Sequence, residues 1–399
     1  MRIGFDAKRA FNNNTGLGNY SRFIIESLSP PTPRWGSLAF PVEQSDKFKF
    51  ILYTQKPRNL EWSMNFNGNV EIVTPPSGGR GAAFWRSWLI VNDLVRDNID
   101  IYHGLSNEIP FGIRKSGVKS VVTIHDLIFL RYPKLYPFID RFIYNKKFRY
   151  ACENADAIIA VSQQTKADIM EFYKIPSERI RVIYQDCQEI FKTLPPTPPR
   201  WGVEEKALPI GEGWEGLKSK YSLEKKYILC VSSFSERKNQ KRLIEAFQKL
   251  NLEDYELILV GGKSKYAEQL FNNSLLGTGG FGSVRGLFAV PSTDLPALYQ
   301  GASLFVYPSF FEGFGIPIVE ALHSGVPVVA ASGSCLEEAG GDGALYANPL
   351  EVNDLAEKMK QVLMNQTLRN DLILKGKEHV KQFSGERIAG QLMELYREL

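Results

Sequence analysis

The chain alternates between short, continuously apolar runs and longer segments in which apolar residues recur every three to four positions. Short runs of this kind are typical of strands buried on both faces, and the longer periodicity is typical of amphipathic helices. In the first half, the predicted strands are Arg2–Phe5, Phe48–Tyr53, Ile99–Tyr102, Ser120–Ile124 and Ala157–Val161. Helical patterns lie between them, for example at Ala83–Arg96 and Gln163–Tyr173.

The same alternation restarts in the second half of the chain. There the predicted strands are Tyr227–Val231, Leu257–Val260, Leu304–Tyr307 and Val326–Ala330. Alternating strands and helices predict an α/β protein with two doubly wound, Rossmann-like domains. Such sheets bind ligands beyond the carboxyl ends of their strands, so we expect a cleft between two facing sheet edges and functional residues directly after strands.

Proline residues mark the division between the two halves. The segment Thr193–Arg200 reads TLPPTPPR, and glycines and charged residues follow it as far as Lys220. Because proline fixes φ and lacks an N–H donor, this stretch is expected to be a connector. The predicted divisions are an N-terminal domain at 1–192, a connector at 193–222, a C-terminal domain at 223–384 and a terminal helix at 385–399. That helix packs on its own domain or crosses back to the first.

Composition narrows the class of protein. The chain has 399 residues, of which 44% are hydrophobic and 23% charged, and its net charge is only +4, so nothing demands a nucleic-acid partner. We read no signal peptide or membrane-spanning stretch. The four cysteines are far apart in sequence, so we expect neither disulfides nor a zinc site. These features favour a cytoplasmic protein.

The strongest chemical signal is the sequence YPSFFEGFGIPIVEALHSG, which begins at Tyr307. Tyr307 ends a predicted strand, Pro317 suits the first turn of a helix, and the helix start favours a phosphate group. Glu312 lies before that helix and Glu320 about one turn inside it, so the two carboxylates can hold the two ends of one ligand. The alternative is an ordinary strand–turn–helix with two solvated glutamates, which the intervening glycines and prolines disfavour.

A second signal, SERKNQK, follows the first strand of the second half. Arg237 and Lys238 lie where that strand passes into a helix. Cations are disfavoured at a helix N-terminus unless a ligand requires them, so this pair is suited to the oxygens of a diphosphate. A solvated basic helix start is the alternative.

The N-terminal half carries two weaker signals. In TIHDLIFL, His125 and Asp126 directly follow a predicted buried strand, where a histidine can contact a sugar hydroxyl. A histidine with a purely structural role is an alternative of equal weight. His103 also follows a strand and is held more loosely as a ligand contact. The turn that contains Gly16 and Gly18 opens a predicted helix, but it is not a GxGxxG motif and is weak evidence by itself.

Together these stretches resemble family 4 of the retaining glycosyltransferases, which have the GT-B fold. The resemblance spans most of the chain and includes GLGNY, HD, AIIAVS, ERKN, VGG, PSFFEGFG and SGVPVV. It implies a nucleotide-diphosphate sugar donor, such as GDP-mannose or a UDP-sugar, no metal or other cofactor, and a glycan or lipid-linked glycan acceptor. Catalytic roles are implied for Glu312, His125, Arg237 and Lys238.

The resemblance also implies the residues that line the two substrate sites. Donor contacts are expected from Gly16, Gly18, Arg237, Lys238, Ser309, Gly313, Phe314, Gly315 and Glu320, with Glu312 on the sugar and Glu320 on the ribose. Acceptor contacts are expected from Trp85, His103 and Asp126. The implied reaction is a front-face substitution in which the acceptor hydroxyl passes its proton to a diphosphate oxygen.

Three segments depart from the family pattern, and one of them is the connector after Phe191, which is longer than the family usually has. Where the family often has a glycine and an acidic residue, the chain reads Gln185-Asp186-Cys187-Gln188, which leaves hinge or acceptor contacts there open. At Val284–Val290, a glycine and an aromatic residue have exchanged places, which leaves the base of the donor open. A nucleotide-sugar hydrolase or epimerase and a non-catalytic nucleotide-sugar-binding subunit are the alternative functions. A dehydrogenase is weaker still, because no GxGxxG follows the first strand of either half.

The segment Arg131–Tyr150 combines six basic residues with seven aromatic ones. An ordinary amphipathic helix whose aromatic residues face the core is the favoured interpretation. The alternative is a helix that lies on an anionic bilayer, at the inner face of the membrane, which suits a lipid-linked acceptor.

Overall fold

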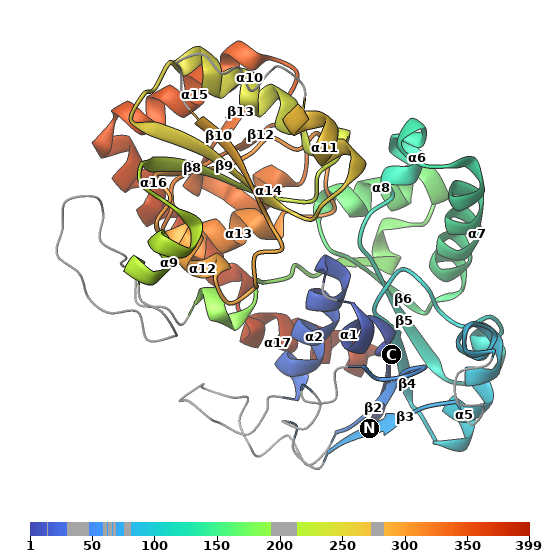
Figure 1. Cartoon of the computed structure of the whole chain (residues 1–399). Helices are drawn as coiled ribbons and strands as arrows, with labels where there is room; N and C mark the ends of the chain where they lie inside the picture. Colours follow the sequence, from blue (N-terminus) through green and yellow to red (C-terminus); the bar gives the residue numbers. More distant parts are fainter. Residues whose placement is uncertain are drawn as a thin grey trace. The chain divides into compact units, whose positions relative to one another are not determined.

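The computed structural model describes residues 1–13, 15–29, 48–58, 62, 66, 69–75, 81–192, 214–272 and 283–399 (Figure 1). The chain divides into two compact units. The N-terminal unit comprises Met1–Asp186 together with Phe383–Leu399, and the C-terminal unit comprises Cys187–Gln382. Each unit contains one sheet whose observed strand pairs are all parallel, which confirms the predicted α/β class with two Rossmann-like sheets.

The N-terminal sheet has the strand order β3-β2-β1-β4-β5-β6-β7. Its strands are β1 (Arg2–Asp6), β2 (Lys49–Tyr53), β3 (Val70–Val73), β4 (Ile101–Gly104), β5 (Lys119–Ile124), β6 (Ala157–Ala160) and β7 (Ile180–Val182). Its α-helices are α1 (Lys8–Asn12), α2 (Gly16–Leu28), α4 (Ala82–Phe84), α5 (Ile90–Arg96), α6 (Ile128–Arg131), α7 (Phe138–Asn154) and α8 (Gln163–Tyr173). A π-helical turn, η2 (Trp85–Leu89), joins α4 to α5, and short 3-10 turns are η3 (Ile113–Lys115), η4 (Pro133–Leu135) and η5 (Ser177–Arg179).

The C-terminal sheet has the strand order β10-β9-β8-β11-β12-β13. Its strands are β8 (Lys226–Val231), β9 (Tyr255–Gly261), β10 (Ser283–Phe288), β11 (Leu304–Tyr307), β12 (Val328–Ala331) and β13 (Ala344–Ala347). Its α-helices are α9 (Trp214–Tyr221), α10 (Gln240–Leu250), α11 (Lys265–Asn272), α12 (Leu295–Gln300), α13 (Ile316–His323), α14 (Leu336–Gly340), α15 (Val352–Met364) and α16 (Gln366–His379). The 3-10 turns are η6 (Glu189–Phe191), η7 (Glu236–Lys238), η9 (Gly341–Gly343) and η10 (Val380–Phe383).

Continuous apolarity in the central strands follows from burial on both faces. Ile3 and Phe5 of β1 are fully buried, and so are Phe305 and Val306 of β11. Helices that face these strands contribute one apolar side each, as α10 does with Leu243, Ile244 and Phe247. Burial of a large apolar side chain stabilises a fold by about 1.5–3 kcal/mol, so these sheet cores fix the position of the loops at their carboxyl edges.

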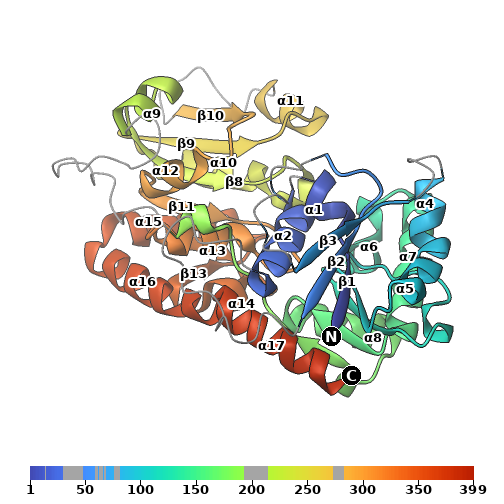
Figure 2. The same ribbon diagram turned by 90° about the horizontal axis from the view of Figure 1, so that it is seen from below.

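The C-terminal helix α17 (Gly385–Glu398) belongs to the N-terminal unit, where it packs against α2 (Figures 1 and 2). Ser384 caps it by accepting a hydrogen bond from the Arg387 N–H, and Leu392 and Tyr396 are buried. The chain therefore enters the C-terminal unit after Asp186 and returns at Phe383.

The apolar runs predicted as strands leave out the four edge strands β3, β7, β10 and β13, and one helix lies where a connector was predicted. Glu71 interrupts the apolar residues of β3, and Arg285 and Gly286 interrupt those of β10, whereas β7 and β13 are only three and four residues long. The predicted connector at 193–222 lies outside the described residues up to 213, and its last part forms α9.

The aromatic residues of α7 do not all face the core, so the favoured interpretation of that segment is wrong for part of it. Phe148 is buried, whereas Phe138 and Phe142 are exposed. Among the helices that the structure describes, none combines the length and apolarity needed to cross a bilayer.

Candidate active site

Two loops of the C-terminal unit meet at the carboxyl ends of β8 and β11. β8 leads into the short 3-10 turn η7, which carries Arg237 and Lys238, and β11 leads into the loop that carries Glu312. The two strands are hydrogen-bonded neighbours although two strands separate them in sequence, so strand order reverses here. Open α/β sheets bind ligands at such a reversal point.

Arg237, Lys238 and Glu312 contact one another at this edge. The Nζ atom of Lys238 lies 2.5 Å from Oε1 of Glu312, and Nη1 of Arg237 lies 2.7 Å from Oε2. Oε1 also accepts a 2.5 Å hydrogen bond from the Ser309 hydroxyl, and Lys238 donates a 2.7 Å hydrogen bond to the Tyr307 hydroxyl. The structure therefore brings together four of the predicted site residues, with one cation opposite each oxygen of the carboxylate.

The charges in this triad keep the carboxylate ionised. Burial by itself would raise the pKa of Glu312, but the positive charges of Lys238 and Arg237 outweigh it and hold the pKa at about 2. Burial lowers the pKa of Lys238, and the charge of Glu312 opposes that change. Two cations and one carboxylate leave a net charge of +1 in a largely desolvated place, which favours an anionic ligand.

Glu320 has a different environment, although it lies only eight positions further along the chain. It is buried in α13, and Oε2 accepts a 2.8 Å hydrogen bond from the Tyr299 hydroxyl of α12. Burial raises the pKa of Glu320 to about 7, and the hydrogen bond from Tyr299 only partly opposes this. Its carboxyl is thus close to half-protonated near neutral pH, in contrast to that of Glu312.

The loop between these glutamates holds its shape by packing. Phe314 is buried, so its side chain is part of the core and not open to a donor; any donor contact would come from its backbone. Gly315 has φ of 129°, and a Cβ atom there would lie 3.0 Å from Cδ2 of Leu336. Gly315 directly precedes α13, so the backbone of Gly313 and Gly315 leads into a helix start that suits an anion.

A hollow of about 280 Å³ lies at the carboxyl ends of β9 and β10. Lys263, Ser264 and Glu268 provide polar groups, and Phe271 and Phe288 provide aromatic rings. These two rings lie 5.7 Å apart and are nearly perpendicular. The hollow therefore combines an aromatic wall with polar groups at its edge.

His125 follows β5 in the N-terminal unit and is buried. Its Nε2 atom lies 2.9 Å from the Leu105 carbonyl oxygen, and its ring packs edge-on against Tyr20. Burial lowers the pKa of His125 to about 4, against the opposing effect of that hydrogen bond, so the ring is neutral near pH 7. Because a carbonyl can only accept, Nε2 carries the proton and Nδ1 carries the lone pair. Asp126 is half-buried, and its Oδ1 accepts a hydrogen bond from the Ile128 N–H.

Two further predicted contacts lie in the interior of the N-terminal unit. His103 is fully buried, with Nδ1 2.6 Å from the Tyr396 hydroxyl and Nε2 2.8 Å from the Thr123 hydroxyl. Trp85 is buried in the core, and its indole N–H donates to Asp93. Their side chains therefore stabilise the unit, and neither lines an open surface as an acceptor contact requires.

The glycine-rich turn of the N-terminal unit opens α2. A Cβ atom at Gly18 would lie 1.8 Å from the Asn13 carbonyl oxygen, so glycine is required for the close approach of α1 to α2. A Cβ atom at Gly16 would meet no other atom within 4 Å. Packing accounts for Gly18, whereas Gly16 is open to a ligand.

Comparison with family models and with known proteins shows which family the chain belongs to. The model of Glycosyl transferases group 1 matches residues 217–379, and the model of Glycosyltransferase Family 4 matches residues 47–185. The O-antigen chain mannosyltransferase B of Escherichia coli is 33% identical, in an alignment that covers 100% of each chain.

The chain is a glycosyltransferase of family 4. A second relative, the serotype-specific mannosyltransferase WbdA of E. coli, is 30% identical over 69% of this chain but only 33% of its own length. Among solved structures, Anabaena HepE in complex with UDP and glucose aligns over 100% of both chains with a TM-score of 0.70 and 19% identity. WaaG, a glycosyltransferase involved in lipopolysaccharide biosynthesis, aligns over 99% of each chain with a TM-score of 0.64 and 16% identity. These likenesses establish the GT-B fold.

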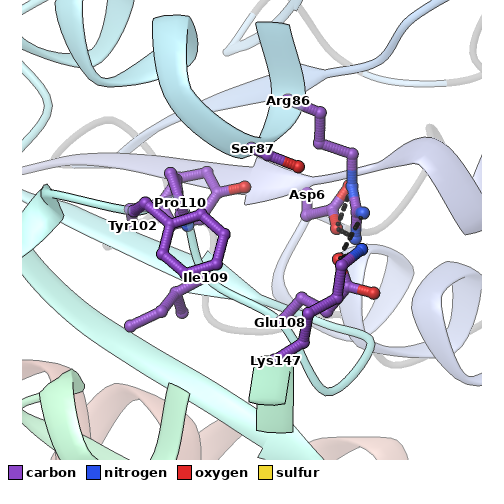
Figure 3. Close-up of a pocket in the computed structure, with 9 residues that line it drawn as sticks. Asp6, Arg86, Ser87, Tyr102, Glu108, Ile109, Pro110 and Lys147 are labelled. Atoms are coloured by element: carbon purple, nitrogen blue, oxygen red, sulfur yellow. Dashed lines mark hydrogen bonds and ion pairs between the residues drawn. The ribbon is translucent and has the colours of Figure 1, made fainter. Parts of the chain in front are cut away.

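This glycosyltransferase also has a charged cluster that the sequence analysis missed (Figure 3). Asp6 ends β1, and the Arg86 guanidinium lies 2.5 Å from its Oδ2 and 2.8 Å from Oε2 of Glu108. Lys147 of α7 lies 3.2 Å from the same Glu108 oxygen. Burial by itself would raise the pKa of Asp6, but Arg86 outweighs it and lowers the pKa. The available signal was that Asp6 directly follows the predicted strand Arg2–Phe5.

Two of the departures from the family pattern have clear places in the fold. Both Asp186 and Cys187 are buried, and the chain passes from the N-terminal unit to the C-terminal unit between them. Gly286 lies within β10, and Phe288 lines the hollow at the end of that strand. The exchange of a glycine and an aromatic residue in this segment therefore alters a wall of the hollow.

Proposed function

We propose that this glycosyltransferase moves a mannosyl group from GDP-mannose to a hydroxyl of a glycan or lipid-linked glycan acceptor, with retention of configuration and without a metal. The observation that carries the proposal is the triad of Arg237, Lys238 and Glu312 at the reversal point of the C-terminal sheet. The choice of mannose rests on the relative that is 33% identical along the whole chain, an O-antigen chain mannosyltransferase.

The two cations of the triad would hold the diphosphate. A nucleoside diphosphate leaving group gains charge as its bond to the sugar lengthens, and fixed cations stabilise that charge. At about 4 Å and an effective dielectric near 20, each contact has a Coulomb energy of about 4 kcal/mol before desolvation. Arg237 can contact two oxygens through its planar guanidinium, whereas Lys238 acts as a point charge.

Glu312 would exchange partners when the donor binds. In the present structure its two oxygens face Lys238 and Arg237, which are the groups that a diphosphate needs. A diphosphate that takes over these cations frees the carboxylate to accept hydrogen bonds from hydroxyls of the transferred sugar. Glu320, at the first turns of α13, would accept a hydrogen bond from the ribose, and the hollow beside β9 and β10 would take the base.

The proposed chemical step is a front-face substitution. The acceptor oxygen forms a bond to the anomeric carbon while the bond from that carbon to the diphosphate oxygen breaks. The acceptor proton passes to the departing diphosphate, which takes the electron pair of the broken bond. Neutral His125 would hydrogen-bond a sugar hydroxyl, and its low pKa keeps it from competing with the cations for the diphosphate. A lipid-linked acceptor would lie at the inner face of a membrane, so peripheral membrane contact is part of the proposal.

A transfer assay with labelled nucleotide sugars tests this function. We expect mannosyl transfer from GDP-mannose to a mannose-terminated glycan, undiminished by EDTA, with an α-linkage detected by NMR. Transfer only from a UDP-sugar would contradict the donor, inverted product configuration would contradict the mechanism, and release of free sugar at the rate of transfer would indicate a hydrolase. A thermal-shift panel identifies the donor independently, because specific binding raises the stability of the folded state.

A further inference from the structure

The N-terminal half of α7 presents apolar side chains to solvent. Phe138, Ile139 and Phe142 are 74%, 69% and 52% exposed, and Ile143 beside them is also exposed. These positions are spaced by three and four residues, so they form one stripe along the helix. Leu135, in the turn η4 that precedes α7, extends the stripe. We name this set, Leu135, Phe138, Ile139, Phe142 and Ile143, the α7 stripe.

The opposite side of the same helix is the side that packs on the core. Phe148, Ala151 and Cys152 are buried among the residues of the N-terminal core. The α7 stripe is therefore additional to the apolar side that the fold needs. Apolar patches of this kind on a folded protein mark a surface that meets another apolar phase.

A second apolar surface adjoins α7. Phe84, Trp88 and Leu89 of α4 and η2 are exposed. The Trp88 ring stacks on Phe111 at 4.6 Å, and Phe111 in turn contacts Tyr150 of α7 at 4.5 Å. This row of rings joins the two helical elements, and the tryptophan and tyrosine are the residue types that prefer the boundary between lipid and water.

Basic residues flank the α7 stripe. The segment 131–150 has six Lys and Arg residues and only one acidic residue, Asp140. Three of the basic residues have carboxylate partners: Arg131 pairs with Asp168, Lys147 with Glu108 and Arg149 with Glu153. In the part of the chain that the structure describes, Lys134 and Lys146 are exposed and have no carboxylate partner. Lys146 instead lies over the Phe142 ring, at 4.4 Å.

We propose that the α7 stripe and its flanking lysines dock this enzyme on an anionic lipid bilayer. Exposed aromatic and aliphatic residues enter the boundary between headgroups and acyl chains, while lysine side chains extend to the anionic headgroups. Lysine beside the apolar residues favours a bilayer over a protein partner, because the cores of protein interfaces are depleted in lysine. This inference deepens the proposed function, since a lipid-linked acceptor lies at such a surface, but it stands on the surface chemistry alone.

Vesicle flotation tests the proposal without requiring catalysis. The probe is a mixture of phosphatidylcholine and phosphatidylglycerol, compared with phosphatidylcholine alone. We expect the full chain to float with the anionic vesicles at low salt and to bind less as salt rises, because screening weakens the lysine contribution. Failure to bind the anionic vesicles overturns the proposal.

The Phe138→Ser/Phe142→Ser double variant tests the stripe itself. Both side chains are already largely exposed, so the fold should be retained, which circular dichroism checks. Each phenylalanine contributes about tenfold or more to partitioning, so we expect about a hundredfold weaker vesicle binding. The matched control is Met364→Ser/Leu374→Ser in the C-terminal unit, where the two residues are 59% and 68% exposed and vesicle binding should not change. Equal binding by the test variant and the wild type, or equal loss in the control, contradicts the proposal.

Two further measurements separate the alternatives. A second copy of the chain is the competing occupant, and a dimer in sedimentation that the Phe138→Ser/Phe142→Ser variant dissociates would overturn bilayer docking. Transfer to a short soluble acceptor should be unchanged in that variant. Absence of mannosyl transfer in the wild type would refute the proposed function and leave the flotation result intact.

Discussion

The two sheets carry charged clusters at their carboxyl edges, and these clusters differ in charge balance. In the C-terminal unit, Arg237 and Lys238 face the single carboxylate of Glu312, which leaves +1. In the N-terminal unit, two cations and two carboxylates cancel, since Arg86 bridges Asp6 and Glu108 and Lys147 pairs with Glu108. Among the ion-paired side chains of these two clusters, those of the C-terminal cluster have a surplus positive charge that is available to an anion.

This difference explains how one type of sheet edge can serve two purposes. The positive cluster is suited to a diphosphate, whereas the neutral cluster has satisfied its own charges and mainly stabilises the fold. A buried ion pair that loses one partner leaves an uncompensated charge, so both clusters are sensitive to substitution but with different consequences. Substitution in the first should change binding and transfer, and substitution in the second should change stability.

Lys238→Met should have the largest effect. It removes one of the two cations that face the diphosphate and keeps a side chain of similar length. We expect transfer to fall by about a thousandfold, as for loss of an electrostatic contact to a developing charge. Steady-state transfer and titration with GDP measure the effect. The control is Lys241→Met, an exposed lysine three positions further on, which should change neither quantity; equal behaviour of the two variants would contradict a diphosphate role for Lys238.

Arg86→Met should affect the N-terminal cluster and not the C-terminal one. It leaves Asp6 and Glu108 without their shared cation, so the free energy of unfolding should fall by about 3 kcal/mol or more, while GDP affinity stays the same. Denaturant unfolding provides the measurement. Arg96→Met is the matched control, because the Arg96 guanidinium is exposed and its ion pairs with Asp93 and Asp97 should contribute little to stability. A loss of GDP affinity in Arg86→Met with unchanged stability would reverse the proposed division of roles.

Glu312→Gln should separate binding from transfer. Loss of the carboxylate raises the net charge of the triad from +1 to +2, so GDP should bind at least as tightly as it does to the wild type. Transfer from GDP-mannose should nevertheless fall by about a hundredfold, because the sugar loses a charged hydrogen-bond acceptor. Glu236→Gln in the same turn removes an exposed carboxylate and is the control. Unchanged transfer in Glu312→Gln would remove it from the catalytic residues.

Tyr299→Phe should have the smallest effect and a characteristic pH dependence. The pKa of Glu320 is raised from 4.5 to about 7, so its contribution to stability is fully present below about pH 4.5 and is lost as pH rises through about 7. The Tyr299 hydroxyl partly offsets this loss by a hydrogen bond to the carboxyl group. Its removal should raise the pKa further and cost about 1 kcal/mol, mainly at alkaline pH. Tyr227→Phe removes a hydrogen bond to the Leu298 carbonyl oxygen, so the stability it loses should not vary with pH; a pH-independent loss in Tyr299→Phe as well would contradict the account.

The sequence predicted the central strands and the main site loop because their signals are local. Central strands such as β1 and β11 are continuous apolar runs, and the glycines and proline around Gly315 directly encode a turn into a helix. Strand β3 was missed because Glu71 interrupts its apolar residues and none of its residues is buried. The outward position of Phe138 was also not predicted. When a helix has apolar residues on both sides, its sequence does not show which side packs against the core.

Contacts between distant segments could not be predicted from sequence. Glu312 faces Lys238 across 74 positions and Arg86 faces Asp6 across 80, so only the order of strands in each sheet brings them together. His103 looked available because it follows a strand, but the helix α17, from the far end of the chain, supplies the Tyr396 hydroxyl that bonds to it. Burial of that kind depends on the complete unit.

The most direct test is a crystal structure of the enzyme with intact GDP-mannose, or a non-transferable analogue of it, prepared in EDTA. The account predicts the diphosphate within hydrogen-bonding distance of Arg237 and Lys238, with the Glu312 carboxylate turned from these cations toward the mannose hydroxyls. A diphosphate bound elsewhere, or one bound at this edge while Glu312 keeps both ion pairs, would contradict it.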